Sequence, residues 1–160
     1  MPQPVVRRLR PLALGALLAL PGLAAAQQGM SSVPSPHDVP TTIDRLVAAL
    51  ESKGLTVFDR IDHGANADGA GLELGPTELL LFGNPALGTP LMRCAPAAGI
   101  DLPQKMLAFV DGGGAVRLAW NDPAWLAERH GIDPDGECAE VLAKVDGALQ
   151  GFAKAATAPE

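Results

Sequence analysis

Residues 76–84, PTELLLFGN, form an almost uninterrupted apolar run of strand length. A strand without polar alternation is typical of the centre of a sheet that is covered on at least one face. Around this run, amphipathic helical patterns alternate with other strand-length segments, and a hairpin pattern follows late in the chain. The order predicts an α+β domain, a two-layer sandwich in which helices cover a mixed β-sheet.

Capping residues delimit the predicted helices. Residues 41–54, TTIDRLVAALESKG, carry an apolar stripe at helical spacing, with Thr41 or Thr42 as the N-cap. A second helix is predicted to start at Thr89, because Pro90 then occupies the first helical position, where a missing N–H costs nothing.

Two later segments complete the predicted order. Residues 104–121 contain two strand patterns around three glycines, which is typical of a hairpin turn that requires positive φ angles. Residues 133–155 close the chain as an amphipathic helix. We assign residues 27–40 to a flexible N-terminal segment with a short edge strand at most. Residues 41–153 form one domain that includes an appended C-terminal helix, and residues 154–160 form a tail.

The first 26 residues have the composition of an export signal. A head with three arginines precedes an apolar run at Leu12–Leu20 and small residues at Ala24–Ala26. This pattern is that of a secretory signal peptide cleaved after Ala26, and the apolar run is shorter than the roughly 20 residues that span a bilayer. We therefore predict a periplasmic or secreted protein without a stable membrane anchor after cleavage.

The charge balance restricts the partners. Twelve Lys and Arg stand against eighteen Asp and Glu, and loss of the three leader arginines moves the formal net charge from −6 to −9. Nucleic acids and anionic lipids require a basic surface on the protein. We therefore expect no nucleic-acid partner.

Cys94 and Cys138 are the two cysteines of the chain. An even number of cysteines in an exported protein favours a disulfide, and two buried thiols acting as small apolar side chains are the alternative. The prediction is a disulfide between Cys94 and Cys138.

The turn after the apolar run has the glycine spacing of a phosphate-binding loop. Gly83 and Gly88 are five positions apart and Thr89 follows, but the lysine of such loops is missing and Pro90 offers no N–H. A helix start can still hold a small anion or polar ligand through its free N–H groups and its dipole. Asn84, Gly88 and Thr89 are therefore candidate ligand-binding residues, and a purely structural turn is the competing interpretation.

His63 is the most informative single side chain. It follows Asp62 at the end of a predicted strand and precedes a run of small residues, so both are candidates for ligand binding. Imidazole also carries protons and ligates metals. An alternative site for a transition metal or haem combines His63 with Met92 or Cys94, although their spacing matches no recognised ligand pattern. An ordinary surface histidine is the third interpretation.

Signatures of catalysis are missing from the sequence. It contains neither a G-x-S-x-G motif nor a local signature of a cysteine nucleophile. Asp59 and Asp62 are three positions apart on a predicted strand and so point to opposite faces. The segment NADGAGLELG lacks the ligand set of a calcium loop. We assign no catalytic residue, and the favoured interpretation requires no cofactor.

Several short motifs also stand in an order that is similar to a known family. These motifs are Asp62-His63, Phe82-Gly83-Asn84-Pro85, Gly88-Thr89-Pro90, Leu102-Pro103, Asn121-Asp122-Pro123 and Trp125. Over about residues 41–132 the chain resembles the DUF302 family of uncharacterised small domains. The resemblance implies a compact two-layer α+β fold of the TT1751-like type, a homodimer, and no established enzymatic activity.

The residues and the resemblance together predict an exported, non-catalytic, homodimeric module that binds a small molecule or a partner protein. The alternative is a periplasmic metal- or haem-binding redox protein that uses His63 with Met92 or Cys94. Neither prediction identifies the ligand.

Overall fold

The computed structural model describes residues 29–159, and the predicted signal peptide lies outside these residues. The strands of this part of the chain are β1 (Met30–Pro34), β2 (Thr56–Asp62), β3 (Thr77–Gly83), β4 (Gln104–Val110) and β5 (Val116–Asn121). The helices are α1 (Val39–Ser52), α2 (His63–Gly69), α3 (Pro85–Cys94), the 3-10 helix η1 (Pro96–Ile100), α4 (Pro123–His130) and α5 (Ala139–Ala156). Between residues 29 and 159, no helix is both long enough and apolar enough to cross a membrane.

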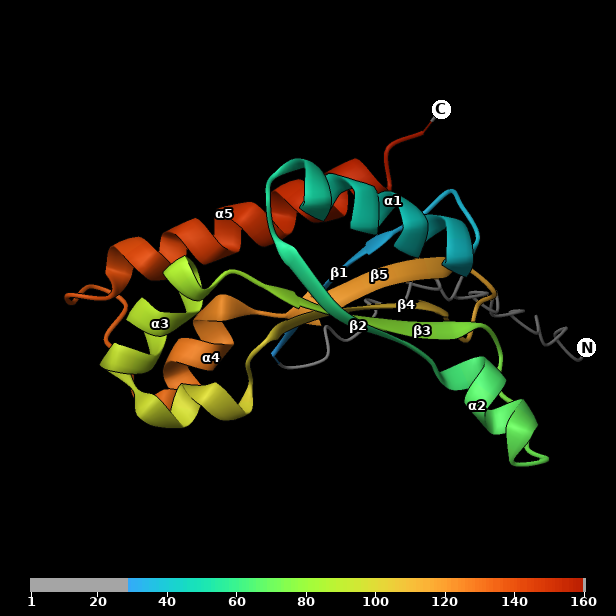
Figure 1. The fold of residues 1–160 in the computed structure, drawn as a ribbon, viewed down its shortest axis with the longest axis horizontal. Helices are drawn as coiled ribbons and strands as arrows, with labels where there is room; N and C mark the ends of the chain where they lie inside the picture. Colours follow the sequence, from blue (N-terminus) through green and yellow to red (C-terminus); the bar gives the residue numbers. More distant parts are fainter. Residues whose placement is uncertain (1–28, 160) are drawn as a thin grey trace, which may run out of the picture.

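The strands form one sheet in the order β1-β5-β4-β3-β2. The prediction of an α+β fold is confirmed, but the predicted mixed sheet is wrong, because all four strand pairings are antiparallel. A mixed sheet requires some parallel strands, which are joined by helices that cross over the sheet. Instead, α2 protrudes at one end of the sheet and returns the chain to the adjacent antiparallel position (Figure 1). The predicted short edge strand is β1.

Helices α1 and α5 lie together on one face of the sheet (Figure 1). Alternate residues of the strands point into this layer, and Leu80, Met106 and Leu118 are fully buried there. They pack against the apolar stripes of α1 and α5, which include Leu46 and Leu149. Burial of these side chains supplies the main driving force of folding.

The other side of the sheet is less covered. Ile61, Leu79, Leu81 and Leu107 alternate with the buried core residues and are only half-buried. We call the surface formed by these four residues the open face. The predicted two-layer arrangement is therefore present, with apolar side chains left on the open face.

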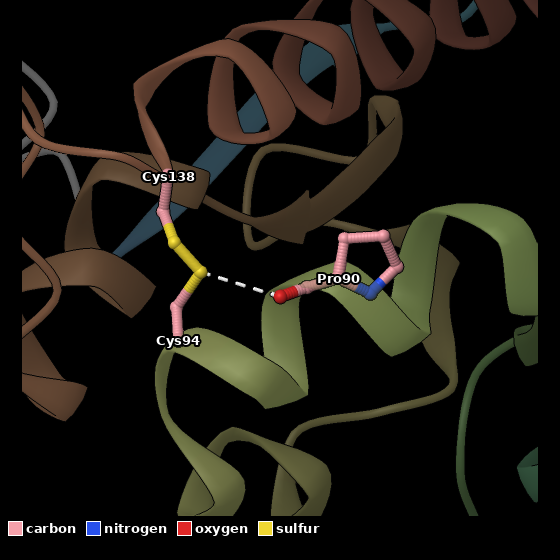
Figure 2. The surroundings of a disulfide bond; sticks show 3 residues. All are labelled: Pro90, Cys94 and Cys138. Atoms are coloured by element: carbon pink, nitrogen blue, oxygen red, sulfur yellow. Dashed lines mark hydrogen bonds between the residues drawn. A yellow bond between two sulfur atoms is a disulfide. The ribbon is translucent and has the colours of Figure 1, made fainter.

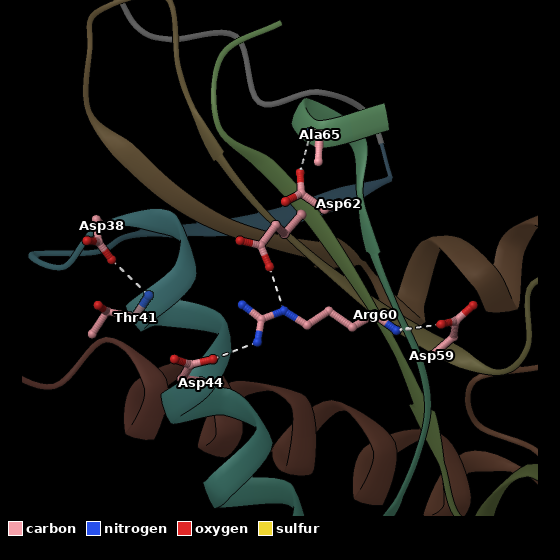
Figure 3. A network of polar contacts seen from close by, with 8 residues as sticks. Asp38, Thr41, Asp44, Asp59, Arg60, Asp62 and Ala65 are labelled. Carbon is pink, nitrogen blue, oxygen red and sulfur yellow. Dashed lines mark hydrogen bonds and ion pairs between the residues drawn. The ribbon is translucent and has the colours of Figure 1, made fainter. Parts of the chain in front are cut away.

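An ion-pair network fixes α1 to the edge of the sheet. The Arg60 guanidinium donates to Glu78 Oε2 and to Asp44 Oδ1, both at 2.6 Å (Figure 3). Glu78 is only 5% exposed, and its ion pair with Arg60 offsets the free-energy cost of burying the carboxylate charge. The hydrogen bond to Glu78 in turn raises the pKa of Arg60 above its ordinary value. The network therefore joins β2, β3 and α1.

The start of α1 differs from the prediction. The helix begins at Val39, and the N-cap is Asp38, whose carboxylate accepts a hydrogen bond from the N–H of Thr41 at 2.8 Å. Pro40 lies in the first helical turn, two positions after the N-cap Asp38. A capping residue with a proline in the first turn also begins α3 and α4. The predicted caps, Thr41 and Thr42, both lie inside the helix.

The start of α3 also differs from the prediction. Asn84 is the N-cap and Pro85 is the first helical residue, so Thr89 and Pro90 lie inside the helix. This stretch contains two pairs in which a capping residue precedes a proline, Asn84-Pro85 and Thr89-Pro90, and the helix begins at the first pair. Pro90 removes one backbone hydrogen bond without ending the helix, which continues to Cys94.

Candidate ligand-binding site

A pocket of about 230 Å³ lies at the end of the sheet where β3 leads into α3. Its walls come from β2, β3, α3, the segment before β4, and α5. Phe82, Leu91, Leu102 and Phe152 are among its lining residues, and none of the lining residues carries a charge. Apolar side chains therefore form most of the pocket wall.

The pocket is closed on one side by the core and open on the other. On the core side, the rings of Phe82 and Phe152 meet edge to face, with their centroids 6.3 Å apart. At the rim, Phe58 is 55% exposed and Met92 is 37% exposed. Large apolar side chains at a rim are unfavourable in water, so an apolar ligand gains contact area from them.

The structure brings the predicted residues Asn84, Gly88 and Thr89 together in this pocket. Their role differs from anion binding, because the first turn of α3 uses its own N–H groups. Pro85 has none, the N–H of Ala86 donates to Asn84 Oδ1 at 2.9 Å, and the next two donate to the backbone oxygen of Asn84 at 2.9 and 3.0 Å. The start of α3 therefore has no free N–H for a phosphate or another anion.

Asp62 and His63 lie at the opposite end of the sheet from the pocket. β2 ends at Asp62, beside the start of β3, whereas the pocket lies where β3 ends at Gly83. Figure 1 shows α2, which starts at His63, and α3 at opposite ends of the molecule. Asp62 is the N-cap of α2, and its carboxylate accepts the N–H of Ala65 at 2.8 Å. The two predicted ligand sites therefore do not converge.

The predicted disulfide between Cys94 and Cys138 is confirmed. It joins the end of α3 to the residue before α5, with the two Cα atoms 6.4 Å apart (Figure 2). This pairing bears on the metal alternative, because metals bind a cysteine thiolate and not a disulfide sulfur.

The structure does not assemble the alternative metal or haem site. The Cys94 sulfur is bonded to Cys138, and Met92 lies at the rim of the pocket, at the other end of the sheet from His63. Across residues 29–159, no group of three or more His, Cys, Asp and Glu side chains is placed to hold a metal ion. This geometry corrects the grouping of His63, Met92 and Cys94.

Most of the pocket lining carries no signal in the sequence. Phe58, Leu102, Val145 and Phe152 line it from segments that are far apart along the chain. The apolar face of the C-terminal helix was recognised, but only as core. Nothing in its spacing distinguishes residues that fill the core from those that leave a cavity beside α3.

The fold and the pocket define a small α+β domain with an apolar pocket at one end of an antiparallel sheet. Residues 31–152 match the family described as "Domain of unknown function DUF302", and the chain belongs to this family. The match includes nearly all of β1 and most of α5, so it extends beyond the predicted resemblance at both ends.

The chain is similar to a solved structure, the uncharacterized conserved protein DUF302 from Bacillus stearothermophilus. The TM-score is 0.70 at 20% sequence identity, and the similarity covers 81% of this chain and 99% of the other. At this identity the comparison shows a shared fold.

Two curated relatives carry the name of a channel. The chain is 50% identical over 112 residues to "Fluoride-specific ion channel FluC 1" of Brucella suis and to the protein of the same name in Brucella abortus. The aligned region covers 70% of this chain, but 44% and 42% of those two proteins. The chain thus spans less than half the length of these relatives.

Proposed function

We propose that this protein is an exported, non-catalytic, homodimeric module that binds a neutral, apolar small molecule in the pocket beside α3. The observation that carries the proposal is a cavity of about 230 Å³ whose lining residues are all uncharged. For comparison, a dry apolar cavity of about 150 Å³ binds benzene in another protein. The pocket is large enough for a ligand of comparable or somewhat greater size.

The lining chemistry limits the ligand class. A charged group would lose its hydration in this pocket without meeting an opposite charge, which costs several kcal/mol or more. Asn84, Thr89 and Gln104 are the polar residues of the lining, and they offer contacts for one uncharged polar end. A mainly hydrocarbon or aromatic molecule with at most one such end fits these walls.

The Gly88→Leu variant tests the pocket. A Cβ at Gly88 would lie 3.7 Å from Leu102, an ordinary contact, so the longer side chain fits the backbone and fills the pocket. We expect the neutral dye N-phenyl-1-naphthylamine to bind the unaltered protein with enhanced fluorescence. The variant should bind it at least tenfold more weakly, a loss of about 1.4 kcal/mol.

Gly69→Leu is the matched control, because Gly69 ends α2 at the far end of the sheet and a Cβ there meets nothing within 4 Å. It should bind the dye like the unaltered protein, and both variants should keep their melting temperature. Equal dye binding by the Gly88→Leu variant, or no binding by the unaltered protein, contradicts a ligand site in this pocket.

A second copy of the chain is the proposed partner of the open face. Leu79 and Leu81 occupy its centre on β3, Asp59 flanks it on β2, and Lys105 flanks it on β4. A two-fold axis parallel to β3 places Lys105 of each copy above Asp59 of the other. The apolar centre and the opposite charges support self-association of this face.

We propose that the protein is exported to an oxidising compartment. The Cys94–Cys138 disulfide supports it, since such bonds persist in the periplasm and outside the cell and are rare in reducing cytosol. The basic and apolar composition of residues 1–26 supports the same location.

An accessory role beside a fluoride channel is a second candidate function. The 50% identity to channel-named proteins that are more than twice as long as the aligned region favours it. We infer that the aligned region of those proteins is an extramembrane domain, because the described part of this chain holds no spanning helix. On this hypothesis, co-expressed fluoride channel co-purifies with tagged protein in mild detergent. Recovery of the channel no greater than with an unrelated tagged periplasmic protein contradicts it.

A further inference from the structure

A second hollow, larger and more polar than the pocket, lies along the edge strand β1. We call it the β1–α5 groove. Its volume is about 1350 Å³, and four consecutive residues, Met30 to Val33, form one wall. One side of α5 forms the other wall, including Gly147, Gly151 and Lys154. No residue of this groove lines the apolar pocket.

β1 is the last strand on its side of the sheet. It pairs with β5 from Met30 to Pro34, and no further strand of the described residues lies beyond it. The outward N–H and C=O groups of an edge strand are hydrogen-bonding positions that another extended chain can occupy. β1 thus offers a template of five residues, Met30 to Pro34, along one wall of the groove.

Two glycines leave part of the side of α5 that lines the groove without side chains. Gly147 and Gly151 are one helical turn apart and exposed, and a Cβ at either position meets nothing within 4 Å. Glycine destabilises a helix interior relative to alanine, and neither packing nor a positive φ requires it here. The absence of side chains leaves space beside β1 for another backbone.

A buried hydrogen-bond donor lies beside this space. Trp120 lines the groove, is 6% exposed, and pairs with Ser31 across the β1–β5 ladder. Its indole Nε1 is buried and has no hydrogen-bond partner among the described residues. Buried N–H groups are almost always paired in native proteins, so this donor points to an acceptor that arrives with a partner.

We propose that the β1–α5 groove binds an extended polypeptide segment of a partner protein, which adds to the sheet as a strand next to β1. A peptide carbonyl supplies the acceptor that Trp120 lacks, and the backbone of the segment passes beside Gly147 and Gly151. Arg117 and Lys154 outnumber Asp111 in the groove, although the whole chain has a net charge of −6. The geometry and charge together favour a segment with at least one acidic residue.

Selection from a display library of random eight-residue peptides tests the proposal on the protein without its signal peptide. Enriched peptides should carry acidic residues, and a synthetic copy should shift the indole N–H signal of Trp120 in a two-dimensional NMR spectrum. Trp125, the other tryptophan, lies outside the groove and serves as the internal reference. Methylating alternate amide nitrogens of the peptide should weaken binding at least tenfold, because strand pairing needs those N–H groups.

The double variant Gly147→Leu, Gly151→Leu should also bind the peptide at least tenfold more weakly while melting at the same or a higher temperature. Ala143→Leu is the matched control, since Ala143 is exposed on the same helix one turn before the groove. It should bind like the unaltered protein, and so should Gly88→Leu in the pocket. Failure to enrich any peptide, or unchanged affinity of the double variant, overturns the proposal.

Discussion

Replacing Cys94 and Cys138 by serine is expected to lower the free energy of unfolding by about 2–4 kcal/mol. The two cysteines are separated by 44 positions, so the disulfide closes a long loop and removes many conformations from the unfolded chain. It also fastens the end of α3 to the start of α5, the two helices that face each other across the pocket. Urea unfolding of oxidised protein and of the double serine variant measures the difference at the transition midpoint.

A thiol reductant distinguishes the effect of losing the disulfide from any effect of the serine side chains. A thiol reductant should destabilise the unaltered protein to the level of the double serine variant and leave that variant unchanged. A difference below about 1 kcal/mol between oxidised and variant protein would show that the disulfide adds little to this fold, contrary to the loop-closure argument. The dye-binding measurement on the same samples then reports whether α3 stays in place without the bond.

Elements with strong local signals were predicted correctly from the sequence. The hairpin between β4 and β5 follows from three consecutive glycines, of which Gly114 has a φ of 83°. For α4, the sequence offers Asn121 or Asp122 as the cap ahead of Pro123, and the structure has Asp122 as the cap. In each case the residues that determine the conformation are neighbours along the chain.

Strand direction was not predictable in the same way. Whether a helix crosses over the sheet or turns back at its end depends on which strands pair, and pairing is decided by packing across the whole domain. The residue types predicted the positions of β2 and β3 but not their antiparallel pairing through α2. The same limit explains the start of α3, because Asn84-Pro85 and Thr89-Pro90 are locally equivalent signals.

The candidate site was predictable only in part. Asn84, Gly88 and Thr89 were selected for a helix start that binds anions, and they do line a pocket, but it is apolar. The difference arises because Asn84 satisfies the first N–H groups of α3 and because α5 supplies an apolar wall. His63 was selected from its neighbours in sequence, and antiparallel pairing places it at the far end of the sheet.

Leu107→Asp is expected to convert the proposed dimer into a monomer. Leu107 lies on the open face beside Leu79, and an aspartate there would be buried between two copies without a positive partner. We expect the association to weaken at least a hundredfold, about 2.7 kcal/mol. Sedimentation velocity at micromolar concentration measures it. The fold should persist, because Leu107 is only half-buried within one chain.

A charge exchange locates the interface more closely. Lys105→Glu should weaken the dimer, because the new carboxylate faces Asp59 of the other copy, and adding Asp59→Lys should restore it. Lys144→Glu, the same reversal of charge at an exposed residue of α5, should leave association unchanged. If the unaltered protein is already a monomer at micromolar concentration, the open face is not a dimer interface. If Lys105→Glu weakens the dimer but Asp59→Lys fails to restore it, the copies pack in an orientation that does not bring these two residues together.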